Sequence, residues 1–192
     1  MAHRKTVRHF HEAGHLHELT FSCYHRMPLL TNDTWREKLA QCVEAAGKET
    51  AFELVGFVFM PEHVHLIVYP TTPNPSISLY LARIKQPFSK QIKDILVKHH
   101  SQLLSKLTVQ ERPGKTCFRF WQEGPGYDRN LFTPEAISSS LEYIHGNPVK
   151  RGLCGCAVVW KWSSARYFLD VPARKQQPDL PKIHGLPEGS LY

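Results

Sequence analysis

Two histidines, His63 and His65, stand one residue apart in the stretch Met60-Pro-Glu-His-Val-His-Leu-Ile-Val68. The apolar run that continues from them is typical of a buried β-strand, and the run before Met60 is typical of its hairpin partner. Because successive strand side chains point to opposite faces, both imidazoles share a face with Ile67. Two imidazoles on one strand face can ligate a single divalent metal ion. The first hypothesis of chemistry is therefore a metal site, on a face that we expect to be open rather than packed.

Pairs of this spacing also arise by chance, because the chain contains 12 histidines. His9-x-His11 and His15-x-His17 lie in a polar N-terminal stretch, where solvated histidines without a binding role are the simpler interpretation. Spacing alone therefore does not separate a metal site from a coincidence. The third pair differs from these two in its position at the start of an apolar strand.

A second polar group lies at the end of the last strong helical pattern. Tyr143 and Asn147 are four residues apart, so they share a helix face if the helix continues past Gly146. An Asn carbonyl oxygen could complete a metal shell begun by two imidazoles. Tyrosine beside such an ion could attack a phosphodiester and form a phosphotyrosine ester. The commoner interpretations stay open: Tyr143 as an aromatic beside the core, and Asn147 as a helix-ending residue before Pro148.

The elements that must position these residues follow one another as β-α-β-β-α-β. Strand patterns cover 16–24, 52–59, 63–69 and 118–122, and helical patterns cover 34–47, 76–95 and 133–146. Residues 99–115 show no period and are predicted to form a loop. This order predicts an α+β fold, a ferredoxin-like β-α-β-β-α-β sandwich with an added C-terminal helix that carries Tyr143. The strand with the histidine pair is expected at the centre of the sheet.

Helix ends are predicted from local residues. Thr34 with Glu37 suggests a capping box for the first helix, and Gly47 is expected to end it. Thr133 is expected to cap the last helix at its start, and Gly146 with Pro148 to close it.

Length and composition limit the class of protein. The 192 residues are 42% hydrophobic, which suits one globular domain with extensions. Lys and Arg number 24 against 17 Asp and Glu, and the resulting net charge of +7 favours a polyanionic partner, with nucleic acid first. With neither a run of 18 apolar residues nor a signal-peptide core, a cytoplasmic protein is expected. The five cysteines lack zinc-knuckle spacing, so we expect reduced thiols and a metal shell of His with O or N donors.

These motifs together resemble the single-tyrosine transposases of the HUH class, and especially the REP-associated tyrosine transposases of bacteria. The resemblance rests on four sets of segments in the family's order: Met60-Pro-Glu-His-Val-His-Leu-Ile-Val68; Phe120-Trp-Gln122 with Gly126-Tyr-Asp-Arg129; Tyr143-Ile-His-Gly-Asn-Pro-Val-Lys-Arg-Gly-Leu153; and Trp162-Ser-Ser164. It spans about residues 16–169. A basic, His-rich arm at 1–15 and a Pro-rich tail at 170–192 lie outside it.

The resemblance implies a metal-dependent transposase or endonuclease that cleaves and rejoins hairpin-flanked single-stranded DNA through a covalent 5′-phosphotyrosine intermediate. It implies Tyr143 as the nucleophile and His63 and His65 as metal ligands, with Asn147 in the position of a polar third ligand. The expected cofactor is Mg²⁺ or Mn²⁺, and the expected partner is single-stranded or hairpin DNA, bound by a monomer or a homodimer. The residues expected to contact DNA are Arg83, Lys85, Lys90, Lys93, Tyr127, Arg129, Lys150 and Arg151.

Two other functions use the same residues. A non-catalytic DNA-hairpin-binding protein would keep the fold and the basic side chains but transfer no strand. A metal-dependent nuclease would attack with bound water and keep Tyr143 only as a structural residue. The sequence contains no His-Glu-x-x-His motif in support of the nuclease.

Overall fold

The computed structural model of the chain describes residues 14–124, 126–169 and 179–187. Most of the N-terminal arm and of the Pro-rich tail predicted from the sequence, including His9 and His11, lies outside the described residues. Within the described part of the chain, no helix is long and apolar enough to cross a membrane.

The centre of the fold is a four-stranded antiparallel sheet in the order β2-β3-β1-β6. Its strands are β1 (Leu16–Ser22), β2 (Phe52–Phe59), β3 (His63–Pro70) and β6 (Tyr127–Leu131). In β3, His65 pairs with Thr20 of β1 on one side and with Val58 of β2 on the other. This is the strand order of a ferredoxin-like sandwich. The predicted fold class is confirmed, and the strand that begins at the histidine pair lies inside the sheet.

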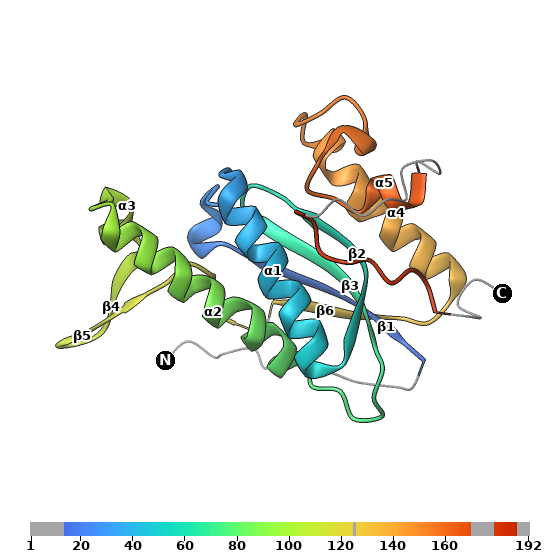
Figure 1. The fold of residues 1–192 in the computed structure, drawn as a ribbon, viewed down its shortest axis with the longest axis horizontal. Helices are drawn as coiled ribbons and strands as arrows, with labels where there is room; N and C mark the ends of the chain where they lie inside the picture. Colours follow the sequence, from blue (N-terminus) through green and yellow to red (C-terminus); the bar gives the residue numbers. More distant parts are fainter. Residues whose placement is uncertain (1–13, 125, 170–178, 188–192) are drawn as a thin grey trace.

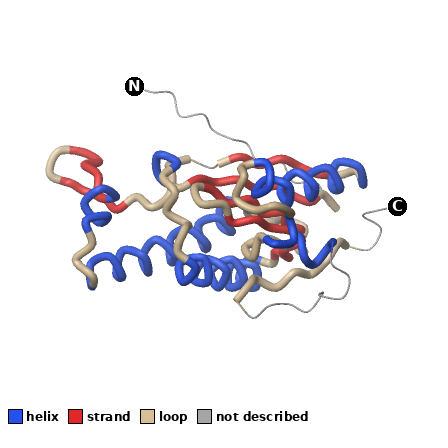
Figure 2. Tube along the Cα trace, turned by 90° about the horizontal axis from the view of Figure 1, so that it is seen from above, coloured by secondary structure: helices blue, strands red, loops and turns tan. Residues whose placement is uncertain are grey.

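Helices cover both faces of the sheet, as Figures 1 and 2 show. On one face, α1 (Asp33–Thr50) and α2 (Ile77–Lys98) pack over the larger apolar core, which includes Val64, Leu66 and Val68 of β3. On the other face, α4 (Pro134–Lys150) packs over a smaller core that includes Ile67. Since side chains alternate along β3, the histidine pair must point toward α4.

Two glycines allow close approaches that this arrangement needs. A Cβ on Gly56 of β2 would lie 2.8 Å from a methyl carbon of Leu141, so glycine lets α4 pack directly on the strand. Gly126 has a φ of +81°, and a Cβ there would collide with the carbonyl oxygen of Thr20. Glycine at this position therefore lets the chain enter β6 directly beside β1.

The fourth strand of the sheet was predicted at 118–122, and this was wrong. Phe120 and Trp121 are buried core aromatics, and only an isolated bridge joins Trp121 to Cys23. The aromatic residues of this irregular segment alternate with polar ones, as they would in a half-buried strand. The true strand, β6, is mostly polar, because its outward residues face solvent and a cavity rather than a core.

The loop predicted at 99–115 is also wrong. The segment contains α3 (Gln102–Leu107), β4 (Thr108–Arg112) and the start of β5 (Lys115–Phe118). The two strands form a separate antiparallel ribbon at the left of Figure 1. Their side chains are mostly exposed, so the apolar periodicity that reveals buried elements is missing.

Helix ends agree with the sequence at some positions and not at others. Thr133 accepts a hydrogen bond from the Ala136 amide, which confirms the predicted cap of α4. Asn32, rather than Thr34, caps α1 by accepting from the Trp35 amide. The helices α1 and α4 both continue past the glycines expected to end them.

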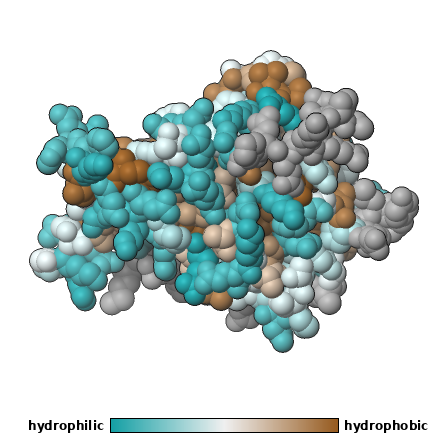
Figure 3. All heavy atoms as spheres, in the orientation of Figure 1, coloured by the Kyte–Doolittle hydropathy of each residue, from teal (hydrophilic) through white to brown (hydrophobic). Residues whose placement is uncertain are grey.

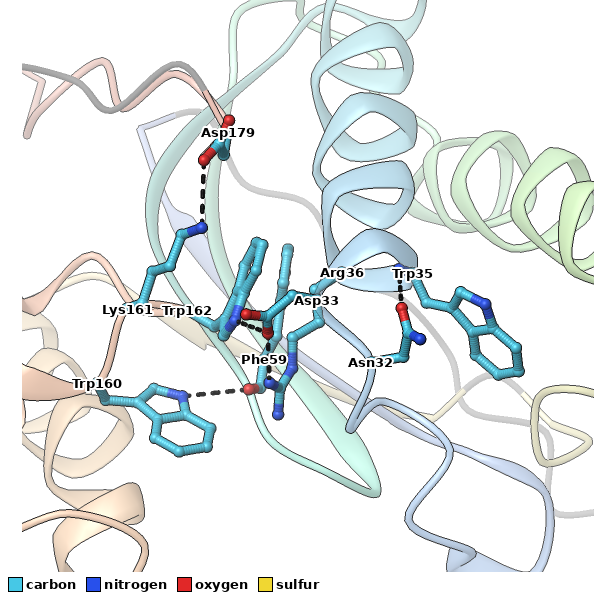
Figure 4. Close-up of polar contacts among 9 residues, drawn as sticks. All are labelled: Asn32, Asp33, Trp35, Arg36, Phe59, Trp160, Lys161, Trp162 and Asp179. Atoms are coloured by element: carbon cyan, nitrogen blue, oxygen red, sulfur yellow. Dashed lines mark hydrogen bonds and ion pairs between the residues drawn. The ribbon is translucent and has the colours of Figure 1, made fainter.

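The short segment 160–162, which follows α4, connects α1 to the end of β2. The Trp162 indole donates to the Asp33 carboxylate at 2.7 Å, and the Trp160 indole donates to the Phe59 carbonyl at 3.2 Å (Figure 4). The Arg36 guanidinium lies 5.1 Å from the Trp160 ring centroid. These contacts fix the end of β2 immediately before the turn that leads to the histidine pair.

Candidate active site

The two imidazoles of the histidine pair contact each other. The Nε2 atoms of His63 and His65 lie 3.0 Å apart, with the rings nearly perpendicular. Only 6% of His63 and 5% of His65 is exposed, so the expectation of an open face is wrong. Helix α4 packs over this face of the sheet, and the Glu62 carboxylate, the Thr20 hydroxyl and the Tyr143 ring lie against the two imidazoles.

The outer nitrogen of each ring has its own hydrogen-bond partner. The Nδ1 of His63 lies 3.1 Å from a carboxylate oxygen of Glu62, and the Nδ1 of His65 lies 2.7 Å from the Thr20 hydroxyl. When both Nδ1 atoms carry the proton, both Nε2 lone pairs point to the space between the rings. Partners of this kind fix the tautomer and the orientation of histidines that bind metal ions.

Burial keeps both imidazoles neutral. It lowers the pKa of His63, although the neighbouring Glu62 carboxylate opposes the shift. Burial, together with the positive charges of a protonated His63 and of Arg26, lowers the pKa of His65 to about 3. Burial alone would raise the pKa of Glu62, but His63 and Arg151 together lower it, so this carboxyl stays ionised. Neutral imidazoles have the free lone pair that a metal ion requires.

Helix α4 places Tyr143 beside the histidine pair. Its ring centroid lies 5.8 Å from that of His65, at an angle of 85°. The side chain is 47% exposed, so its hydroxyl group can be reached from outside. The Lys150 ammonium lies 5.3 Å from the Tyr143 ring centroid and brings a positive charge to the same spot.

Asn147 lies between two contacts that α4 makes with this region. Tyr143 precedes it by four residues and Arg151 follows by four, so the three share one side of the helix. Arg151 forms an ion pair with Glu62 at 2.8 Å. The Nδ2 atom of Asn147 is buried without a hydrogen-bond partner, which is unusual for a buried amide. The Nδ2–H groups of Asn147 are therefore free to donate to an acceptor on a ligand, whereas only the Oδ1 atom of this side chain could bind a metal ion.

The donor set fits one metal ion. Two nitrogens each about 2.1 Å from an ion and at right angles would be about 3.0 Å apart, and the Nε2 atoms of His63 and His65 are separated by 3.0 Å. The described residues contain no group of three or more His, Cys, Asp or Glu side chains that could hold a metal. Asn147, water or a phosphate oxygen would have to complete the shell.

The residues expected to contact DNA fall into two sets. The first set is near Tyr143: Tyr127 and Arg129 line a cavity of about 480 Å³ together with His65 and Tyr143, while Lys150 and Arg151 lie at the end of α4.

The second set is Arg83, Lys85, Lys90 and Lys93, all on α2 and so on the opposite side of the sheet. Arg83 pairs with Glu49 at 3.2 Å, and the Lys85 ammonium lies over the Phe21 ring, where burial lowers its pKa to about 8. Figure 3 shows that the face formed by α1 and α2 is largely hydrophilic.

Some residues of this region were not predicted from the sequence. Glu62 and Thr20 orient the imidazoles, and Glu18 and Ser140 line the cavity and bond to each other at 2.6 Å. The signal for Glu18 and Thr20 was present in the alternation of β1, whose polar positions share one face of the strand. Ser140 gave no signal, because a serine inside a helix usually faces solvent.

The comparisons with known proteins concern the family and the fold of the chain. The family model described as "Transposase IS200 like" matches residues 13–112, just over half of the chain. The match includes the histidine pair and ends before Tyr143.

A Haemophilus influenzae protein named as a REP-associated tyrosine transposase is 28% identical over 122 residues, which are 64% of this chain. The aligned part spans 62% of that relative's length. A solved REP-associated tyrosine transposase, bound to a REP hairpin, superposes with a TM-score of 0.67 at 20% identity, over 93% of this chain and 92% of the other. This likeness concerns the fold. The chain belongs to the IS200-like transposase family.

Proposed function

We propose that this protein is a metal-dependent single-stranded DNA endonuclease and strand transferase that works through a covalent 5′-phosphotyrosine on Tyr143. The observation that carries the proposal is the meeting of three side chains from two elements. His63 and His65 aim neutral ring nitrogens at one point, and the half-exposed Tyr143 packs against the second of them. Family membership supports the same reading.

The residues of the chain divide the reaction between them. His63, His65 and the Asn147 amide would hold one Mg²⁺ or Mn²⁺, and a bound ion of this kind polarises the scissile phosphate and balances its developing charge. The Tyr143 oxygen attacks phosphorus and gives its proton to solvent. The bond to the 3′ oxygen breaks, and that oxygen takes up a proton to leave a 3′-hydroxyl. The Lys150 ammonium beside the Tyr143 ring would help to balance the negative charge of the reacting phosphate.

The ester keeps the energy of the cleaved bond, so a 3′-hydroxyl can reverse the step and join strands without ATP. Glu62 and Arg151 have a positioning role, since their ion pair connects α4 to the residue next to His63. Tyr143 on α4 and the imidazoles on β3 are thereby held in register.

The proposed substrate is DNA with a hairpin beside the cut strand. The solved relative is bound to a REP hairpin, and the net charge of +7 suits a polyanion. Tyr127, Arg129 and Lys150 surround the approach to Tyr143 and are proposed to contact the single strand.

Formation of a covalent adduct tests the proposal. Wild-type protein is mixed with labelled single-stranded oligonucleotides that carry hairpins, with Mg²⁺ or Mn²⁺, and resolved on a denaturing gel. We expect a denaturant-resistant band and mass spectra that locate the added 5′-phosphate on Tyr143. Tyr143→Phe keeps the ring against His65 and should form no adduct. Tyr127→Phe is the matched control, because Tyr127 is also half-exposed and borders the same cavity.

Other outcomes point to the other two functions. Cleavage without any adduct would favour a nuclease that uses bound water. Binding without cleavage, under every metal tested, would favour a hairpin-binding protein. An adduct that persists in Tyr143→Phe would reassign the nucleophile.

A further inference from the structure

The cavity of about 480 Å³ beside Tyr143 is larger than a metal site and one phosphate need. It lies between the sheet, from β1 and β6, and α4, and two of its wall residues are His65 and Tyr143. Its volume is in the range of cavities that bind small molecules, ~300–1,000 Å³. Because Tyr143 is part of the cavity wall, the nucleotide adjacent to the scissile phosphate is the part of the substrate that would lie nearest to the cavity.

The polar wall of the cavity is built around Glu18. This carboxylate is only 5% exposed, and its Oε2 atom accepts a hydrogen bond from the Ser140 hydroxyl at 2.6 Å. An Arg129 guanidinium nitrogen lies 4.0 Å from the same oxygen. The Oε1 atom accepts no hydrogen bond from any of the described residues, and the protein does not fully enclose it. One carboxylate oxygen is thus held in place and the other is left for a ligand.

The rim of the cavity is aromatic. Tyr127 lies on β6, opposite Thr20 of β1, and is 53% exposed. An exposed ring beside a charged groove is a stacking surface for unpaired bases, because every base has a π-face. Arg129 follows two residues later on the same face of β6, so the stacking ring and the guanidinium border the cavity together.

We propose that this cavity binds one unstacked nucleobase next to the scissile phosphate, and that Glu18 selects a base with an amino group. The inference rests on the proposed function, since it supplies the specificity of the same site. A carboxylate only accepts hydrogen bonds, so the edge of the base that faces it must donate. Guanine, adenine and cytosine carry an amino donor beside a ring or carbonyl acceptor. Arg129 is the donor for that acceptor, as arginine is in direct base readout.

Thymine does not match this wall. It has no amino group, and its one ring N–H lies between two carbonyl oxygens that would face the carboxylate. Guanine matches best, because two neighbouring donors would face Glu18 while its carbonyl oxygen faces Arg129.

The test uses a pool of oligonucleotides, each with one hairpin stem and randomised single-stranded flanks. Members that bind the full-length wild-type chain in chelator, where no cleavage occurs, are recovered and sequenced. We expect one flank position to disfavour thymine by about tenfold relative to the best amino-bearing base. Glu18→Gln, which offers both a donor and an acceptor, should lose that preference and keep the preferences at other positions.

Two further variants keep the test clear. Glu142→Gln removes the same charge from an exposed position of α4 that does not line the cavity, and it should bind like the wild type. Arg129→Met changes a half-exposed side chain and should weaken the same preference even if Glu18→Gln folds poorly.

The outcomes separate this inference from the proposed function. If wild type forms the covalent adduct but thymine is accepted equally at every flank position, the base-binding cavity is wrong and the proposed function stands. A preference that survives in both Glu18→Gln and Arg129→Met also overturns the inference. If the chain binds no member of the pool and forms no adduct, both proposals fail.

Discussion

The two faces of the sheet are built from alternate residues of the same strands, yet they differ in chemistry. The face beneath α1 and α2 is filled by apolar side chains, many of them fully buried phenylalanine and leucine. The face beneath α4 has a smaller apolar core and holds most of the buried polar side chains, among them Glu18, His63, His65, Ser140, His145 and Ser164. The first face therefore supplies most of the packing energy, and the second can carry polar groups that packing alone would disfavour.

The largest difference between the two faces is expected when two neighbouring residues of β3 are each replaced by alanine. His65→Ala removes a proposed metal ligand and should lower metal-dependent DNA cleavage by at least ~100-fold. Leu66→Ala, on the fully buried other side, should instead lower the free energy of unfolding by about 2–5 kcal/mol. Cleavage assays with Mn²⁺ and urea denaturation of both variants measure the two effects. Full activity of His65→Ala, or of wild type in excess chelator, would contradict the metal site.

A second prediction concerns how closely α4 must pack on the sheet. Gly56→Val would push a side chain into Leu141 and Ile144, so it should lower the free energy of unfolding by ~1–3 kcal/mol and reduce adduct formation at Tyr143. Gly155→Val is the control, since nothing lies within 4 Å of a Cβ placed there. Urea denaturation and the adduct gel test both variants. Normal adduct formation by Gly56→Val would show that the position of α4 has little influence on the chemistry.

The third prediction uses acid to probe the polar face. His145 lies on α4, its Nε2 atom is 2.7 Å from the Ser164 hydroxyl, and burial lowers its pKa to about 4. The unfolded chain therefore binds this proton more readily, so the stability that is present above pH 6.5 is lost as the pH falls toward 4. Between pH 7 and pH 5 wild type should lose about 2 kcal/mol more stability than His145→Gln. Equal losses in urea denaturation at the two pH values would refute this.

The smallest expected effect comes from removing one lysine charge on either side of the sheet. Lys150→Gln, beside Tyr143, should weaken binding to a hairpin oligonucleotide and reduce the slope of log K against log salt by roughly one unit or less. Lys90→Gln, on α2, should change the slope less, because α2 lies across the sheet from the proposed site. Fluorescence anisotropy at several salt concentrations measures both. A larger effect of Lys90→Gln would mean that DNA also reaches α2.

The sequence predicted the parts of the fold that alternate or repeat with apolar residues. The strand from His63, its central place and the cap at Thr133 were all visible in it. The polar strand Tyr127–Leu131 was missed, because a strand that faces a cavity lacks the apolar alternation on which strand prediction depends. The burial of His63 and His65 was missed as well, since it depends on a helix that is about 80 residues away in the chain.

Candidate site residues were predictable where a motif contained them. His63, His65, Tyr143 and Asn147 came from spacing and from resemblance, and the structure places their elements side by side. The cavity residue Glu18 could not be singled out, because its role depends on Ser140 and Arg129, which come from distant elements. Contacts of this kind are set by tertiary packing.

The irregularity of β2 between Leu54 and Gly56 has a consequence for changes in chain length. One residue there, Val55, has no pairing partner across the strand, while the side chains of Leu54 and Phe57 both enter the core under α1 and α2. A deletion of Val55 would therefore leave every other side chain of β2 on its present face. A deletion between Phe57 and Phe59 would turn part of the strand over and expose a core aromatic. Natural relatives are expected to gain or lose a residue at the first place and not at the second.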